Sequence, residues 1–256
     1  MTEKFFINDA EKIIPPVNDS PYRRVLCFGD VHAALDKLNR LLEKLAPAED
    51  DLLIFLGDYF NKYKSKNLET LLRLDELNRR ENVIMLCGNS DDDIMESFRY
   101  DKSITAALFF RYFFRNSREL FDSYKEKNIP RIFSRFMKNL PSSYQLTIGG
   151  RKYFCCHSGI EVGTPLERQE KDWLIGQEDY ENFYLNYSGD AVIIVGHKSP
   201  KKIFNFFPEI FGDAKPDLTK PIKIPTKNIL MLDTRAKEKN GFLSCVDIIS
   251  GEFWQS

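Results

Sequence analysis

The stretch Cys27-Phe28-Gly29-Asp30-Val31-His32 ends an apolar run in a glycine and two side chains that can bind a metal ion. Four later apolar runs end in a comparable way, and the polar residues that close them are Asp58, Asn89, His157 and His197. A short run that is apolar at every position is typical of a strand buried on both faces of a sheet. Ligands of α/β proteins gather beyond the carboxyl ends of such strands, so we expect these side chains to lie close together.

The chain has only three histidines, and each of them ends one of these runs. A lone histidine is more simply a core or surface residue, but that interpretation would have to account for all three at once. Neutral imidazole is the most frequent protein ligand of metal ions. The predicted ligands, all oxygen or nitrogen donors, are Asp30, His32, Asp58, Asn89, His157 and His197. This donor set favours manganese, with iron or zinc as alternatives.

The number of predicted ligands indicates more than one metal ion. A tetrahedral zinc takes about four ligands, and the sequence offers more than that. Two divalent ions about 3.5 to 4 Å apart, sharing one carboxylate, can hold both the attacking and the leaving oxygen of a phosphoryl group. Glycine precedes four of the predicted ligands, where we expect it to allow a sharp turn and a close approach of the backbone.

The composition is that of a globular protein, since 43% of the 256 residues are hydrophobic and 13% are aromatic. A formal net charge of -1 gives no reason to expect a nucleic acid or an anionic membrane as partner. No apolar run approaches the roughly 18 residues of a membrane span, and the polar amino terminus lacks a signal core, so we expect a cytoplasmic protein. The five cysteines should be buried thiols, with Cys155 and Cys156 on opposite faces of a strand.

The order of the segments predicts an α/β fold. Strand-like runs alternate with helical leucine patterns over residues 27–87, which indicates a βαβαβ unit with parallel strands. The helices are expected at 33–45 and 68–80, and the later strands of the unit at 52–56 and 83–87. We expect a single domain over residues 1–256, in which residues from about 91 to 140 form a helical cap beside the substrate cleft.

Beyond Pro141 the patterns become those of β-structure. A hairpin is expected around Gly149-Gly150, followed by a strand at 191–195. Strands at 229–232, 242–249 and around Phe253 should form an antiparallel meander. The proline-rich residues 204–226 predict a long ordered loop near His197.

Residues 109–115, rich in aromatic residues and arginine, have two interpretations. Aromatic rings interleaved with arginine occur on surfaces that bind single-stranded nucleic acid. A helix that packs its rings inward and leaves its arginines in solvent has the same composition. We favour the packed helix and expect no nucleic-acid partner, because nothing else in the composition is basic.

Together, the motifs resemble those of the calcineurin-like metallophosphoesterases, in the phosphoprotein phosphatase branch. That branch includes bacterial and phage serine/threonine phosphatases and diadenosine-tetraphosphate hydrolases. The matching segments are Gly29-Asp30-Val31-His32, Gly57-Asp58-Tyr59, Gly88-Asn89, His157-Ser158-Gly159 and Gly196-His197. Weaker matches are Asn116, Pro165-Leu166, Trp173 and Leu232-Asp233-Thr234.

The resemblance implies a four-layer sandwich of two mixed β-sheets flanked by helices. It also implies which residues hold which metal ion. Asp30, His32 and Asp58 would hold one ion, while Asp58, Asn89, His157 and His197 would hold the other. Asp58 would bridge the two ions.

Two positions depart from the family pattern in ways that affect catalysis. Ser90 stands where the family has the histidine that protonates the leaving oxygen, and Lys62 stands in place of a phosphate-binding arginine. We predict catalytic roles for Asp58, Ser90 and Asp91 and substrate-binding roles for Lys62, Asn116 and Lys198. Asp91 would be a poor proton donor, because nearby dications favour its ionised form. A simpler role for Asp91 is a helix cap, since a carboxylate suits the amino-terminal end of a helix.

The leading hypothesis is a dinuclear, metal-dependent phosphoester hydrolase. It would be a phosphomonoesterase that attacks a phosphoprotein or a nucleotide with metal-bound hydroxide. Without a positioned acid, which typically contributes ~10²- to 10⁴-fold, it should favour leaving groups that depart without a proton. One alternative is a non-catalytic relative that binds a phosphorylated partner. Another is a phosphodiesterase, although Lys198-Ser199 lacks the second histidine usual in that group. The sequence leaves the oligomeric state open.

Overall fold

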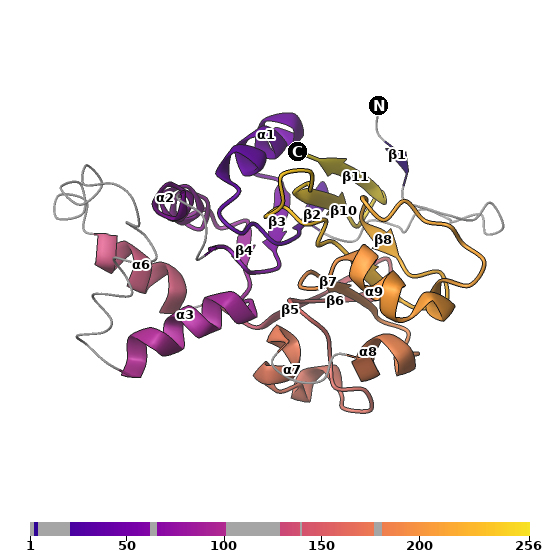
Figure 1. The fold of residues 1–256 in the computed structure, drawn as a ribbon. Helices are drawn as coiled ribbons and strands as arrows, with labels where there is room; N and C mark the ends of the chain where they lie inside the picture. The colour runs from indigo at the N-terminus through magenta and orange to yellow at the C-terminus, as the bar shows by residue number, and fades with distance from the viewer. Residues whose placement is uncertain (1–2, 5–20, 62–65, 101–128, 139, 177–180) are drawn as a thin grey trace.

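The computed structural model describes residues 3–4, 21–61, 66–100, 129–138, 140–176 and 181–256. They form two mixed β-sheets packed face to face, with helices on both outer surfaces (Figure 1). The four-layer sandwich implied by the resemblance is therefore confirmed.

The first sheet has the strand order β1-β11-β10-β2-β3-β4. Its strands are β1 (Glu3–Lys4), β2 (Arg24–Phe28), β3 (Asp51–Phe55), β4 (Val83–Met85), β10 (Ser244–Asp247) and β11 (Glu252–Gln255). Strands β2, β3 and β4 are parallel, because α1 (Leu35–Leu45) and α2 (Asn67–Leu77) return the chain between them. The predicted βαβαβ unit is confirmed.

The second sheet has the strand order β5-β6-β7-β9-β8. Its strands are β5 (Ser143–Ile148), β6 (Arg151–Cys156), β7 (Val192–Val195), β8 (Ile222–Lys223) and β9 (Ile229–Met231). The expected hairpin is formed by β5 and β6, and β6, β7 and β9 are parallel. Short helices cover the outer face: η1 (Leu166–Arg168), α7 (Lys171–Ile175), α8 (Glu181–Asn186), α9 (Pro200–Phe206) and η2 (Pro208–Phe211).

Two expectations for the last part of the chain are wrong. Strand β9 pairs with β7 and β8 in the second sheet, whereas β10 and β11 pair in the first, so these strands do not form one meander. All three residues of β9 are buried, as suits a strand inside a sheet. Residues 204–226 are also more regular than a loop, since they include the end of α9, η2 and β8.

Alternating side chains divide the core between the layers. In β2, Leu26 and Phe28 pack in the cluster that includes α1 and α2, whereas Val25 and Cys27 pack between the sheets. In β6, Cys155 lies between the sheets and Cys156 faces the helices of the second sheet, as expected. All five cysteines are buried free thiols.

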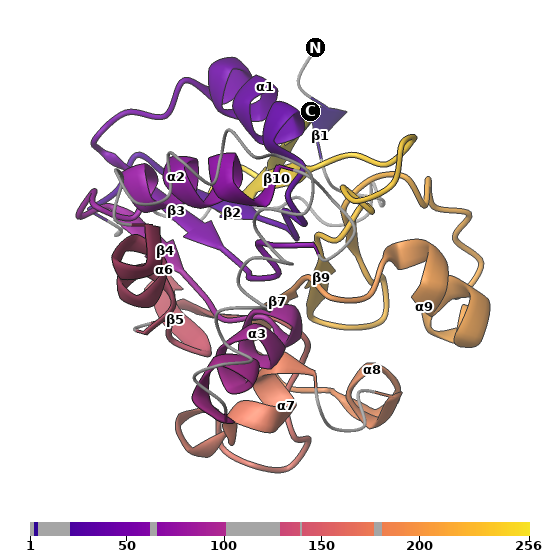
Figure 2. The same cartoon turned by 60° about the vertical axis from the view of Figure 1, so that its left-hand side comes forward.

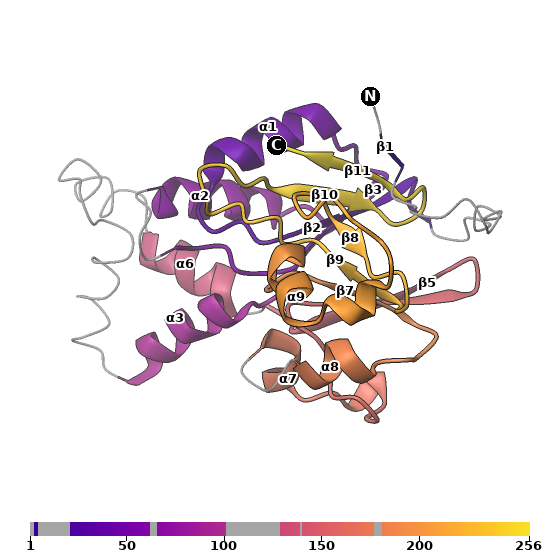
Figure 3. The same ribbon diagram turned by 45° about the vertical axis from the view of Figure 1, so that its right-hand side comes forward.

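Two described helices fall within the predicted cap. They are α3 (Asn89–Tyr100) and α6 (Ile129–Lys138), which lie on one side of the sandwich, brought forward in Figure 2. An ion pair anchors α6 to α2, since Arg135 Nη2 lies 2.6 Å from both carboxylate oxygens of Asp75. Figure 3 brings forward the opposite side, which carries α9. Residues 101–128, with the aromatic stretch 109–115, lie outside the described part, so the covering role of the cap stays a prediction.

No helix among the described residues has the length and apolar character needed to cross a membrane.

Candidate metal centre

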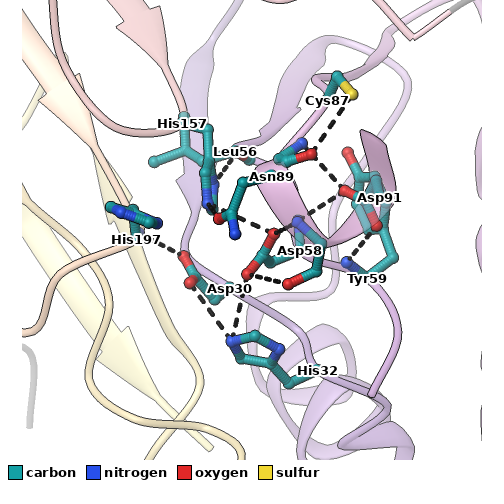
Figure 4. A network of polar contacts seen from close by, with 12 residues as sticks. Asp30, His32, Leu56, Asp58, Tyr59, Cys87, Asn89, Asp91, His157 and His197 are labelled. Carbon is teal, nitrogen blue, oxygen red and sulfur yellow. Dashed lines mark hydrogen bonds and ion pairs between the residues drawn. The ribbon is translucent and has the colours of Figure 1, made fainter. Parts of the chain in front are cut away.

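The six predicted ligands lie around one point, where the carboxyl ends of strands from both sheets meet (Figure 4). The first sheet supplies Asp30 and His32 after β2, Asp58 after β3 and Asn89 after β4. The second sheet supplies His157 after β6 and His197 after β7. The structure thus brings together donors that are far apart in sequence, as the runs predicted.

Asp58 lies between two groups of donor atoms. On one side, His32 Nε2 is 3.5 Å from Asp30 Oδ2 and 3.6 Å from Asp58 Oδ2. On the other, His157 Nε2 is 3.4 Å from Asp58 Oδ1 and 3.1 Å from Asn89 Oδ1. One ligand atom each of Asp30, Asp58 and His157 lies within 4.8 Å of the others. This is where a carboxylate shared by two ions would have to be.

Contacts across the sheets orient the two histidines of the second sheet. His157 Nδ1 donates to the carbonyl of Leu56 at 2.9 Å, and this contact turns Nε2 towards Asp58. The backbone N–H of His197 donates to Asp30 Oδ1 at 3.0 Å. The rings of His157 and His197 are 5.0 Å apart, centre to centre.

Three of the ligands have a backbone conformation that is rare outside glycine. The angle φ is 46° at His32, 53° at Asp58 and 60° at His197. Such conformations cost of order 1–3 kcal/mol and persist where the surrounding contacts hold them, often at functional sites. The turns after β2, β3 and β7 are therefore built to present these side chains.

The glycines beside the ligands allow the close approach that the sequence predicted. At Gly57, where φ is 105°, a β-carbon would overlap the backbone nitrogen of Gly88. At Gly196, a β-carbon would overlap Asp30 Oδ1. A side chain at either position would separate segments that carry ligands.

Ser90 donates two hydrogen bonds to the carboxylate of Asp58, the candidate bridge. Its backbone N–H donates to Asp58 Oδ1 and its hydroxyl donates to Asp58 Oδ2, each at 2.9 Å. The residue at the position where the resemblance implies an acid histidine is thus a neighbour of the candidate bridge.

Asp91 lies behind Asp58, fully buried, and does not line the cleft described below. Its Oδ2 accepts from the backbone N–H of Asp58 at 2.7 Å and of Gly88 at 3.0 Å, and its Oδ1 accepts from that of Tyr59 at 3.0 Å. Burial and the Asp58 carboxylate raise the pKa of Asp91, while the three N–H groups oppose this rise.

These contacts argue against the predicted catalytic role of Asp91. Its oxygens face backbone amides instead of the cleft, and the contact with Gly88 caps the start of α3. We infer that Asp91 positions the turns that carry Asp58 and Asn89. The helix-cap alternative is the one that the geometry supports.

The charges of the centre fit divalent ions. Burial is the largest influence on His197 and lowers its pKa to about 2, so its imidazole is neutral. Burial also opposes the charged form of His32, but Asp30 and Asp58 outweigh it and raise its pKa to about 9. Asp30 Oδ2 is buried, and its neighbour among the described residues is His32 Nε2 at 3.5 Å, a weak contact for a buried carboxylate that a closer cation would improve. The donors present therefore suit two cations.

A cleft of ≈ 710 Å³ opens over these ligands. Its lining residues are His32, Asp58, Asn89, Ser90, His197, Lys198, Ser199, Lys201, Lys202, Asn205, Phe206, Asp233, Arg235, Lys237 and Glu238. Lys198, a predicted substrate-binding residue, is among them, and burial with nearby Lys202 and Lys237 lowers its pKa to about 8. The other two predicted substrate-binding residues, Lys62 and Asn116, lie outside the described residues.

Sequence reasoning did not assign several residues of this cleft. Asp233 is buried, and burial together with Asp30 raises its pKa to about 7. It ends the apolar run of β9 as the ligands end theirs, so the same pattern could have identified it. Phe206, Arg235 and Lys237 follow no such pattern.

A sandwich of two sheets that joins aspartate, asparagine and histidine ligands beneath a basic cleft defines a class of metal-dependent phosphoesterase. The profile of one family, described as Calcineurin-like phosphoesterase, matches residues 23–220, and the chain belongs to this family. No curated protein sequence matches the chain significantly.

Solved structures show the same fold. A candidate diadenosine tetraphosphatase is 17% identical, with a TM-score of 0.63 over 94% of this chain and 95% of its own. A metallophosphoesterase from Sphaerobacter thermophilus is 14% identical, with a TM-score of 0.51 over 91% of this chain and 88% of its own.

Proposed function

We propose that the protein hydrolyses phosphomonoesters of a phosphorylated protein or a nucleotide at a centre of two divalent ions, with manganese preferred. One observation carries the proposal: donor atoms of Asp30, Asp58 and His157 lie within 4.8 Å of one another, next to a cleft rich in lysine. Oxygen and nitrogen donors without thiolate suit manganese.

Each residue of the centre has a role that its contacts support. Asp30 and His32 would hold one ion. The other ion would be held by Asn89, His157 and His197. Asp58 would bind both ions. Such a pair supplies hydroxide near neutral pH and positive charge against the phosphoryl oxygens. Ser90 orients Asp58, and the ammonium group of Lys198 attracts the phosphate dianion into the cleft.

Ser90 restricts which esters react quickly. Its hydroxyl is a weak acid and already donates to Asp58, so it does not protonate a leaving oxygen. Phenolate, with a pKa near 10, leaves without a proton far more easily than the alkoxide of serine. With manganese present, aryl phosphates should therefore react much faster than phosphoserine peptides. Equal rates on the two substrates would show that another group supplies the proton.

The central experiment combines metal analysis with an aryl-phosphate assay. Wild-type protein loaded with manganese should retain metal and turn over p-nitrophenyl phosphate. The Asp58→Asn variant should lose most of the bound metal and most of the turnover. Asp190→Asn removes a carboxylate that is exposed and remote from the cleft, so it should behave as wild type. Turnover that survives Asp58→Asn would overturn the proposal.

A second candidate function is a non-catalytic module that binds a phosphorylated partner. The observation in its favour is that the cleft-lining histidines among the described residues, His32 and His197, are both candidate ligands, which leaves no histidine as acid. Bound metal without any Asp58-dependent turnover, on aryl phosphates as well as on peptides, would favour this module.

A further inference from the structure

Helix α9 presents an exposed aromatic ring to the cleft. Phe206 is 56% exposed, and among the described residues the other exposed large apolar side chain is Leu185, at 37%. Phe206 lines the cleft, whereas Leu185 does not. An apolar ring left in water beside a candidate active site is a potential contact for a ligand.

Several positively charged side chains line the cleft together with this ring. Lys202 lies one helical turn before Phe206, and its ammonium is 5.9 Å from the centre of the ring. Lys201 and Lys237 line the same cleft. Among the described residues, no carboxylate lies within 4.0 Å of the ammonium groups of Lys201, Lys202 or Lys237.

The cleft holds more positive charge than one phosphate requires, since among the described residues five basic side chains line it and the carboxylates other than Asp58 are Asp233 and Glu238. The phosphoryl group that reacts would lie against the metal ligands, where the ammonium group of Lys198 can contact it. Lys201 and Lys202 lie on α9 with Phe206, whereas Lys237 lies in the loop between β9 and β10. All three line the same cleft, and without an anion their ammonium groups would repel one another. This grouping of positive charges with an exposed ring fits a ligand that carries several phosphates and a flat ring.

We propose that this part of the cleft binds a nucleoside polyphosphate. Lys201, Lys202 and Lys237 would contact the phosphates, and the base would stack on Phe206. The proposal rests on the metal-dependent hydrolysis proposed above and extends it from phosphomonoesters to a terminal phosphoanhydride. Water would take the terminal phosphoryl group, and the shortened nucleotide would leave through its own phosphate oxygen. Stacking on an aromatic ring accepts any base, because every base has a π face. A nucleotide is favoured over a phosphopeptide because a terminal ring next to consecutive charges is a constant feature of nucleotides only.

The test is equilibrium binding by calorimetry, with manganese present, of a nucleoside triphosphate whose β–γ bridge is methylene. Phe206→Ala should weaken binding about tenfold or more, and Phe206→Trp should restore it. The loss should be much larger for the nucleotide than for inorganic tripolyphosphate, which has no base. Lys202→Gln should weaken the binding of both ligands.

Matched controls separate these effects from general changes of the surface. Leu185→Ala removes the other exposed apolar side chain, and Lys152→Gln removes an exposed lysine of β6 outside the cleft. Both should bind the nucleotide as wild type does. If Phe206→Ala matches Leu185→Ala, or if a phosphoserine peptide loses as much affinity as the nucleotide, the proposal is overturned.

The outcome for hydrolysis is distinguishable from the outcome for binding. If aryl phosphate shows no Asp58-dependent turnover while Phe206→Ala still weakens binding of the nucleotide analogue, the hydrolase proposal fails and the proposed nucleotide site stands. If turnover is Asp58-dependent but the analogue binds independently of Phe206 and Lys202, the nucleotide site fails alone.

Discussion

Replacing Asp91 with alanine should destabilise the protein strongly, because its carboxylate accepts three backbone N–H groups inside the core. A buried N–H left without an acceptor costs about 1–3 kcal/mol. Loss of the carboxylate also relieves its repulsion with Asp58, which offsets part of this cost. We therefore expect Asp91→Ala to lower the free energy of unfolding by about 3–5 kcal/mol, a large effect for one substitution.

Asp91→Asn should cost less, because its single carbonyl oxygen can still accept the two N–H groups that meet at Oδ2. Only the N–H of Tyr59 would then face an amide, so we expect a loss of about 1–3 kcal/mol. Asp91→Ala should thus destabilise the protein more than Asp91→Asn, because alanine offers no acceptor to the three backbone N–H groups and asparagine offers one.

Urea denaturation with manganese present, together with metal analysis, measures both effects. Asp93→Ala is the matched control, since Asp93 lies two residues further along the same helix but is exposed, and the variant should lose less than about 1 kcal/mol. Equal unfolding midpoints for Asp91→Ala and Asp93→Ala would refute the positioning role. An Asp91→Ala variant with normal stability and metal content but no turnover would restore Asp91 as the acid.

Three further predictions concern the metal centre and the stability of the sheet. Gly196→Ala should lower the metal content, because its methyl group would overlap Asp30 Oδ1; unchanged stoichiometry by mass spectrometry would contradict this. Chelation should lower the melting temperature, and manganese at about 100 times its Kd should return about 2.7 kcal/mol. Asp58→Asn should show neither response, and a response of wild-type size would exclude its assignment as bridge. Burial opposes the charge of Asp51, but two bonds from Arg24, at 3.0 and 2.6 Å, outweigh it and lower its pKa. Because the folded pKa lies below the unfolded one, this stability is present above about pH 3.9 and is lost as pH falls through the lower value. Asp51→Asn should thus reduce stability at pH 7 and reduce its acid dependence, which denaturation curves at pH 3 and pH 7 would check.

The clustering of the candidate ligands could be predicted from sequence because the physical rule behind their positions is local. A strand that is buried on both faces must be apolar, so the first polar residue after it marks the place where it reaches the edge of the sheet. His157 and His197 follow this rule, as does Asp233, which we could have included. The pattern needs no knowledge of which strands are neighbours.

The pairing of the strands could not be predicted in the same way. Strands β9 and β10 are both fully buried and follow one another in the chain, yet they belong to different sheets. Their partners, β7 and β2, lie far away in sequence, and periodicity carries no information on that choice.

The direction of single side chains is equally a long-range property. Asp91 could point to the cleft or to the amides behind Asp58, and the placement of α3 decides between them. Phe206 lies on a helix of seven residues, too short for an apolar stripe to show which face is covered.

The contacts of His157 with Leu56 and of His197 with Asp30 join the two sheets at the centre. During synthesis on the ribosome, the donors of the first sheet emerge well before these histidines, and β10, the partner of β2, emerges near the end. A nascent chain that ends before residue 157 therefore offers only part of the coordination shell. If metal binds at the proposed ligands, its tight retention would therefore require that both halves of the polypeptide have docked.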